Sequence, residues 1–245
     1  MKLAGHHAVV TGGGTGIGAA IARALAAEGA KLTLVGRRRE PLEDVGQGDF
    51  DALIAPADVT DRAQVERAFA LARAAQGPIS ILVNNAGAAA GAPFARVSET
   101  LWREMLAVNL DGMFHCCQAA LADLLAADAG RIVTVASMAG LHGFAYAAPY
   151  IAAKHGAVGL TRALAAEYGR TRLTANAVCP GFVDTEMTAR SVETIVAKTG
   201  RNAAEARAEL AGMNPSGRLI APEDVAAAVR DLVLSNRNGE AVEIA

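Results

Sequence analysis

The fold of this chain follows from one stretch near its start, Val9-Val10-Thr11-Gly12-Gly13-Gly14-Thr15-Gly16-Ile17-Gly18. Residues 8–10 are apolar, as in a buried strand, and residues 16–28 repeat apolar side chains at helical spacing until Gly29. Glycines between them permit tight backbone angles and let the chain approach a pyrophosphate, to which the helix N-terminus offers amide donors. A lone glycine motif can also be an ordinary flexible turn. Its place between the first strand and the first helix favours a dinucleotide site.

Strands and helices alternate along the rest of the chain. Further strands are predicted at residues 31–35, 52–55, 79–83, 131–136, 173–178 and 240–244. Helices are predicted at residues 61–75, 98–127, 150–168 and 222–234, with helical pieces at 188–213 and an interruption near 109–112. Helix-length segments between strands imply right-handed crossovers and a parallel sheet. Because no linker or repeat divides the chain, we expect one doubly wound α/β domain of Rossmann type over residues 1–245, with about seven strands and helices on both faces.

Composition narrows the function classes. The formal net charge of −2 argues against a nucleic-acid partner. No apolar run approaches the roughly 20 residues of a membrane span, so no membrane partner is expected. The three cysteines, Cys116, Cys117 and Cys179, form no CxxC pair and no zinc-ligand spacing, which predicts no metal site and fits a reducing compartment. Residues 1–10 run into a strand without signal-peptide organisation, so the expected location is the cytoplasm.

The end of the second predicted strand bears on the choice of dinucleotide. An acidic residue there would bind the adenosine ribose of NAD, but Leu34-Val35-Gly36-Arg37-Arg38 contains none. The guanidinium of Arg37 can instead pair with a 2′-phosphate. For Arg38 and Arg39 we expect a solvated basic turn. NADP(H) is therefore the preferred cofactor, with NAD(H) possible.

A tyrosine, a lysine and a serine suggest carbonyl chemistry. Tyr150 and Lys154 stand four residues apart, on one face of a predicted helix. Reduction of a carbonyl needs a proton donor, and a nearby cation lowers the pKa of tyrosine from its ordinary value of about 10. Ser137 follows the fifth strand, at the edge of the sheet where ligands bind. Taken singly, a Tyr/Lys pair is commonly structural and such a serine is commonly a turn residue.

Together these residues resemble the short-chain dehydrogenase/reductase family, over nearly the whole chain from Leu3 to Ile244. The motifs that carry the resemblance occur in the family's order. They are Thr11-Gly12-xxx-Gly16-x-Gly18, Asp58-Val59, Asn84-Asn85-Ala86-Gly87, the tetrad Asn109, Ser137, Tyr150 and Lys154, and Pro180-Gly181-Phe182-Val183-Asp184-Thr185.

The resemblance implies a role for each matched residue. Tyr150 is the acid/base, and Ser137 hydrogen-bonds the substrate oxygen. Lys154 binds the nicotinamide ribose and lowers the tyrosine pKa, while Asn109 positions a water that links Lys154 to solvent. The implied cofactor-binding residues are Gly12, Gly14, Thr15, Gly16, Ile17, Gly18, Arg37, Asp58, Val59, Asn85, Ala86, Gly87, Lys154, Pro180, Gly181, Val183 and Thr185.

The expected function is NAD(P)(H)-dependent interconversion of a ketone and a secondary alcohol. The segment 214–225 resembles the 3-oxoacyl reductase and 3-hydroxyacyl-CoA dehydrogenase branches, which suggests a 3-oxoacyl or 3-hydroxyacyl thioester. The alternatives are a general secondary alcohol, steroid or sugar dehydrogenase, a catalytically silent dinucleotide-sensing protein, and a structural subunit of an acyl-processing complex. A helical substrate lid is expected at about residues 186–213, with Lys198, Arg201 and Arg207 on a solvated face balanced by glutamates. His142 is expected to be exposed or hydrogen-bonded rather than a second base.

The resemblance also implies an assembly. Relatives often form tetramers by pairing the helices that correspond to residues 98–127 and 150–168, so a homotetramer is expected. Family members usually continue past the last strand into a glycine-containing tail, whereas this sequence stops at Glu243-Ile244-Ala245. Subunit contacts through that tail are therefore not implied here.

Overall fold

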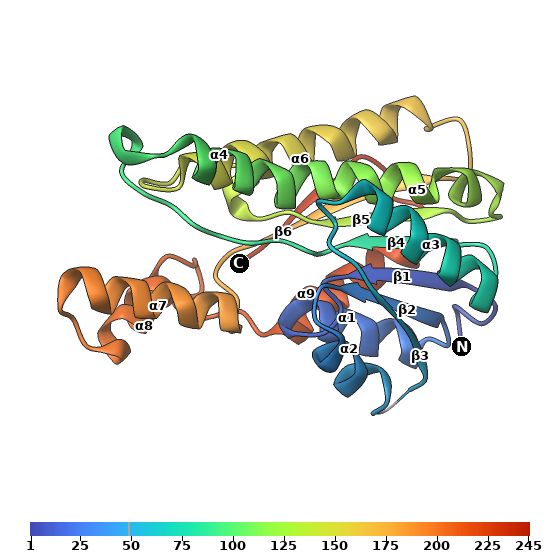
Figure 1. Ribbon diagram of the computed structural model, residues 1–245, viewed down its shortest axis with the longest axis horizontal. Helices are drawn as coiled ribbons and strands as arrows, with labels where there is room; N and C mark the ends of the chain where they lie inside the picture. The colour runs from blue at the N-terminus through green and yellow to red at the C-terminus, as the bar shows by residue number, and fades with distance from the viewer. Residues whose placement is uncertain (49) are drawn as a thin grey trace.

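A parallel sheet runs through the centre of the molecule and carries helices on both faces (Figure 1). The structure is a computed structural model that describes residues 1–48 and 50–245. These residues form one seven-stranded sheet in the order β3-β2-β1-β4-β5-β6-β7. The strands are β1 (His7–Thr11), β2 (Lys31–Gly36), β3 (Ala52–Pro56), β4 (Ile81–Asn84), β5 (Arg131–Val135), β6 (Thr174–Pro180) and β7 (Ala241–Ile244). The predicted doubly wound α/β domain is confirmed.

The strand order reverses between β1 and β4. The chain first adds β2 and β3 on one side of β1 and then places β4 to β7 on the other. Val9 on β1 is in parallel register with Thr33 on β2 and with Leu82 on β4. In open sheets of this kind, ligands bind beyond the carboxyl ends of the strands at such a reversal. The glycine-rich turn follows β1 at this point, and residues 85–87 follow β4.

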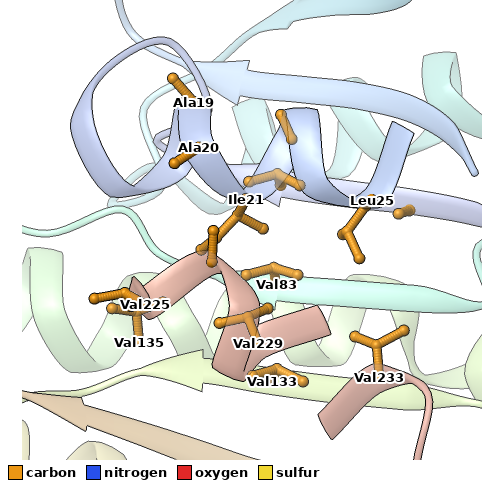
Figure 2. Packing of buried hydrophobic residues seen from close by; sticks show 14 of the residues in the cluster. Ala19, Ala20, Ile21, Leu25, Val83, Val133, Val135, Val225, Val229 and Val233 are labelled. Atoms are coloured by element: carbon orange, nitrogen blue, oxygen red, sulfur yellow. The ribbon is translucent and has the colours of Figure 1, made fainter. Parts of the chain in front are cut away.

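Two helical layers cover the sheet, and each buries its own apolar cluster. One layer contains α1 (Gly16–Ala27), α2 (Arg39–Gly46) and α9 (Pro222–Val233), and Figure 2 shows Ile21, Leu25 and Val229 packed between its helices and the strands. The other contains α3 (Arg62–Gln76), α4 (Glu99–Leu106), α5 (Gly112–Ala126) and α6 (Ala148–Glu167). The helices α7 (Glu186–Thr199) and α8 (Ala203–Gly212) extend from one end of the body (Figure 1). Within the described ranges, no helix is long and apolar enough to cross a membrane.

The long helix predicted at residues 98–127 is interrupted as expected. A π-helical stretch, Ala107–Asp111, separates α4 from α5. Such a stretch changes the backbone hydrogen-bond register and is frequently found at functional sites. It contains Asn109, which is therefore set in an irregular part of the helix rather than on a regular face.

One helix, α2, was not predicted from the sequence. Arg38 is exposed outside a helix, but Arg39, which was expected in the same solvated turn, is helical. Arg39 is the first residue of α2, and its guanidinium pairs with Glu43 at 3.1 Å. Leu42 and Val45 bury the inner face of α2 in the first apolar cluster. Two apolar positions in eight residues are too few for a periodicity signal, and packing against the sheet stabilises this helix instead.

Candidate active site

The glycine-rich turn after β1 is locked to the segment after β4. The side-chain amide of Asn85 donates to the carbonyl oxygens of Thr11 at 2.9 Å and Gly12 at 3.1 Å. In return, Thr11 Oγ1 accepts from the backbone amides of Asn85 and Ala86, each at 3.0 Å. Gly12 has a φ of +64° and a Cβ there would lie 2.8 Å from Asn85 Nδ2, so no larger residue fits. Asn85 and Ala86 therefore support the turn directly.

The turn leaves both space and free amide groups for an anion. A Cβ on Gly18 would overlap the carbonyl oxygen of Gly12, which explains why glycine stands at the start of α1. Thr15 directly precedes α1, but its side chain makes no capping hydrogen bond. The first amide groups of the helix are therefore open to another acceptor. Across the turn, Thr185 Cγ2 lies 3.1 Å from the place of a Cβ on Gly16. Open amides and missing side chains at a helix N-terminus fit the pyrophosphate of a dinucleotide.

Other predicted cofactor residues follow the neighbouring strands at the same edge of the sheet. Arg37 follows β2 and is exposed. Asp58 follows β3, and its carboxylate accepts from the backbone amide of Thr60 at 2.9 Å and from the hydroxyl of Thr60 at 2.8 Å. Val59 is buried, and a Cβ on Gly112 would lie 2.7 Å from Val59 Cγ2. The glycine at the start of α5 thus allows the segment after β3 to approach α5 closely.

The structure brings Ser137, Tyr150 and Lys154 together. Ser137 follows β5, where its Oγ accepts from the backbone amide of Ala139 at 3.1 Å, and its side chain lies close enough to Tyr150 to lower the tyrosine pKa. Tyr150 and Lys154 lie one turn apart on α6. Lys154 Nζ is 5.8 Å from the centre of the Tyr150 ring and donates to the carbonyl oxygen of Val135 at 2.9 Å. The three side chains therefore share the carboxyl edge of β5.

Burial controls the protonation of this group. It raises the pKa of Tyr150 above 10, and the hydrogen bond with Ser137 acts in the opposite direction. Burial also lowers the pKa of Lys154 to about 8. The direction for Tyr150 is opposite to the lowering that the resemblance implied. The physical reason is that desolvation, which disfavours tyrosinate, outweighs the hydrogen bond with Ser137.

Asn109 holds the segment after β4 beside Lys154. Its side-chain amide donates to the carbonyl oxygens of Ala88 at 2.9 Å and Met105 at 3.0 Å, and its Oδ1 accepts from the amide of Ala88 at 3.3 Å. A Cβ on Gly87 would lie 2.8 Å from Asn109 Oδ1 and 3.7 Å from Lys154 Nζ. A cavity of about 10 Å³, enough for one water molecule, is lined by Asn109 and Lys154. The water-positioning role of Asn109 stays a prediction, and this cavity is where such a water would lie.

The segment after β6 forms the opposite wall. Pro180 ends β6, and the amide of Gly181 donates to the carbonyl oxygen of Ile244 at 2.9 Å. Val183 forms a parallel bridge with Ile220. The side chain of Asn214 holds this segment in place by binding the backbone of Phe182. Sequence reasoning did not identify this residue. The asparagine-proline pair at 214–215 indicates a turn, but nothing in the sequence shows which backbone groups the amide binds.

The predicted lid is helical, and the charged side chain of Arg207 forms an ion pair outside it. Residues 188–213, predicted to be helical in pieces, lie mainly in α7 and α8. Arg201 pairs with Glu209, as the expected balance of charges suggests. Arg207 instead pairs with Asp184 at 2.6 Å, so α8 is tied to the segment after β6. His142 is exposed and lies 3.7 Å from a carboxylate oxygen of Glu243.

The sequence also matches a known family. A family model described as "short chain dehydrogenase" matches residues 6–196. This chain belongs to the short-chain dehydrogenase family. The resemblance inferred from the glycine-rich turn and the Tyr150/Lys154 pair is thereby confirmed.

Relatives within the family act on different substrates. The chain is 41% identical over 233 residues to ketoacyl reductase 1 of the granaticin polyketide synthase of Streptomyces violaceoruber, covering 92% of this chain and 85% of that protein. It is 39% identical over 233 residues to the L-tagatose-forming galactitol 2-dehydrogenase of Cereibacter sphaeroides, covering 93% and 87%. A crystal structure of an actinorhodin polyketide ketoreductase with NADPH matches with a TM-score of 0.93 and 35% identity, covering 98% of this chain and 95% of that one. The chain is thus an enzyme that interconverts ketones and alcohols with a nicotinamide dinucleotide.

Proposed function

We propose that this short-chain dehydrogenase is an NADP(H)-linked ketoreductase of 3-oxoacyl thioesters, with Tyr150 as its acid/base. The observation that carries the proposal is the meeting of Ser137, Tyr150 and Lys154 at the carboxyl edge of β5. This edge adjoins the strand reversal where the glycine-rich turn offers its open amides. A carbonyl oxygen placed between Ser137 and Tyr150 would face two hydroxyl donors.

Each group has a defined chemical task in the reduction. A bound reduced nicotinamide supplies the hydride that forms the new C–H bond. The C=O π bond breaks at the same time, and negative charge develops on oxygen. Tyr150 transfers its phenolic proton to that oxygen, while the hydroxyl of Ser137 donates a hydrogen bond to it. Lys154, held by Val135, places a positive charge near the phenolate that remains.

The choice of substrate class rests on two kinds of support. The granaticin relative is named as a ketoacyl reductase, and segment 214–225 resembles acyl-processing branches of the family. Large apolar side chains are also exposed around the site: Phe144 lies between Ser137 and Tyr150 in the chain, and Met187 lies at the start of α7. Exposed apolar groups at a site suit an acyl chain better than a polyol. The galactitol relative supports the alternative, a sugar alcohol dehydrogenase.

A substrate panel separates these possibilities. Initial rates are measured with NADPH and with NADH on an acetoacetyl thioester, on a simple ketone of equal chain length, and on L-tagatose. We expect the thioester to give a kcat/KM at least about tenfold above the ketone, which corresponds to about 1.4 kcal/mol of extra transition-state binding. A faster reaction of L-tagatose would favour the sugar alcohol dehydrogenase. Binding of NADPH without turnover of any carbonyl would favour a dinucleotide-sensing protein, or a structural subunit if a partner protein binds tightly.

Several finer features belong to the same proposal. The exposed Arg37 supports a preference for NADP(H), although NAD(H) remains usable. The helices α7 and α8 would form the substrate lid at about residues 186–213. A homotetramer would form through α4, α5 and α6. A cytoplasmic location is supported by the three cysteines, which are all free and buried.

A further inference from the structure

The side chain of Asn214 makes an unusual set of backbone contacts just after α8. It is 3% exposed. Its Oδ1 accepts from the backbone amide of Phe182 at 2.8 Å, and its Nδ2 donates to the carbonyl oxygen of the same residue at 2.9 Å. Nδ2 also donates to the carbonyl oxygen of Arg218 at 2.7 Å. The amide thereby binds both polar groups of Phe182, much as a neighbouring strand would.

This contact requires glycine at the preceding position. A Cβ on Gly181 would overlap Asn214 Oδ1. Ile220 continues the pairing on the same side, since its amide donates to the carbonyl oxygen of Phe182 at 2.9 Å. The carbonyl oxygen of Ile220 accepts from the amide of Asp184 at 2.9 Å. Segment 214–220 therefore fastens residues 181–184 along their length, and Asn214 fixes one end.

The fastened segment reaches the glycine-rich turn. Thr185 directly follows it, and the side chain of Thr185 packs beside Gly16. Thr188, at the start of α7, donates from Oγ1 to the carbonyl oxygen of Val183 at 2.5 Å. Asn214 is thus outside the site but sets the position of the wall that faces the turn. A shift of this wall would change the width of the gap between Thr185 and Gly16.

We propose that Asn214 is a positioning residue that fixes residues 181–185 against the nicotinamide half of the cofactor. The inference rests on the proposed placement of that half beside this segment. The adenine half is expected at different elements, after β2 and β3, where Asn214 makes no contact. Loss of the Asn214 amide should therefore weaken binding of the whole dinucleotide and leave binding of an adenine-half fragment unchanged.

The test compares two buried asparagines. Asn176, on β6, is 0% exposed; its Nδ2 donates to the carbonyl oxygen of Arg237 at 2.7 Å and its Oδ1 accepts from the amide of Glu240 at 3.1 Å. It lies nearer the amino end of β6, away from the site, so Asn176→Ala is a matched control for Asn214→Ala. The dissociation constants of NADPH and of adenosine 2′,5′-bisphosphate are measured by calorimetry for both variants, together with Tm.

We expect both variants to lower Tm, and only Asn214→Ala to raise the Kd of NADPH, by about tenfold, with the Kd of the bisphosphate unchanged. Equal effects of the two variants on NADPH, or equal weakening of NADPH and bisphosphate, would overturn the inference. If Asn214→Ala does not fold, Asn214→Asp decides. The aspartate keeps the oxygen that accepts from the Phe182 amide and loses both donated hydrogen bonds, to Phe182 and to Arg218. An unchanged Kd of NADPH in that variant would also overturn the inference. A wild type that binds neither ligand would instead count against the proposed function.

Discussion

Lys154 Nζ donates a 2.9 Å hydrogen bond to the carbonyl oxygen of Val135, which ties α6 to the strand that precedes Ser137. The lysine is 6% exposed, and burial lowers its pKa from 10.5 to about 8. Folding therefore disfavours the charged ammonium. Between pH 8 and 10.5 the unfolded chain holds a proton at this position that the folded chain has lost, so stability must rise with pH across that window.

Replacement of this lysine should remove that pH dependence. In Lys154→Met the proton difference is absent. We expect the free energy of unfolding of the wild type to rise relative to the variant between pH 8 and 10, by up to about 1.4 kcal/mol per pH unit near pH 9. Below about pH 7 the difference should change little. Urea unfolding of both proteins at pH 7, 8, 9 and 10 measures this difference in free energy. A difference that is constant over the whole range would show that the lysine is not desolvated.

The acid/base role of Tyr150 predicts a selective loss of turnover. Tyr150→Phe keeps the ring on α6 and removes the transferable proton. We expect kcat to fall at least about 100-fold, with the Kd of NADPH changed by less than about twofold. Tyr168→Phe, at the far end of the same helix, serves as the control and should keep full activity. Retention of more than a tenth of the wild-type kcat in Tyr150→Phe would remove Tyr150 from the acid/base role.

The fold and much of the site could be predicted because they leave local patterns in the sequence. Apolar runs separated by helical periods indicate a parallel sheet, and the glycine-rich turn marks where it begins. The break near Asn109 was predicted from sequence and is a π-helical stretch. Two features have no local signal. The helix α2 depends on the burial of Leu42 and Val45 against the sheet. Asn214 acts on Phe182, 32 residues away, and only the folded chain reveals that pair.

The pKa of Tyr150 shows a different limit of sequence reasoning. The spacing of Tyr150 and Lys154 suggests that a cation lowers the tyrosine pKa. In the structure the lysine is bonded to Val135, and burial of the phenol has the larger effect. Spacing places two side chains on one helix face, but it does not determine which hydrogen-bond partner each selects.

The expected tetramer can be tested through α5. This helix exposes Phe114, which is 41% exposed, and Leu125, which is 37% exposed. Two large apolar side chains on a helix expected at a subunit contact would be buried in the assembly. Light scattering at micromolar concentration should therefore give four times the mass of the chain. Phe114→Glu should reduce that mass, because a charge would be buried without a partner. A wild type that is only monomeric would contradict the expected tetramer.

Arg37 provides the test of cofactor choice. It follows β2 and is exposed, beside Gly36 at the position where a carboxylate would bind the ribose of NAD. A hydrogen bond to a charged group contributes roughly 1.5–3 kcal/mol, which corresponds to about ten- to a hundredfold in affinity. Since the guanidinium is exposed, salt should screen the contact, and we expect a preference for NADPH near the lower end of that range.

The comparison of two neighbouring arginines makes this measurement specific. Arg38 directly precedes α2, and its side chain makes no capping hydrogen bond. Arg38→Ala therefore removes a similar charge one residue away. The ratio of kcat/KM for NADPH to that for NADH is measured in the wild type and both variants at low and high salt. Arg37→Ala should lower the ratio by about tenfold and reduce its dependence on salt, while Arg38→Ala should change it little. An equal loss in both variants would mean that the 2′-phosphate responds to the general positive field after β2, and an unchanged ratio in Arg37→Ala would remove this residue from the cofactor site.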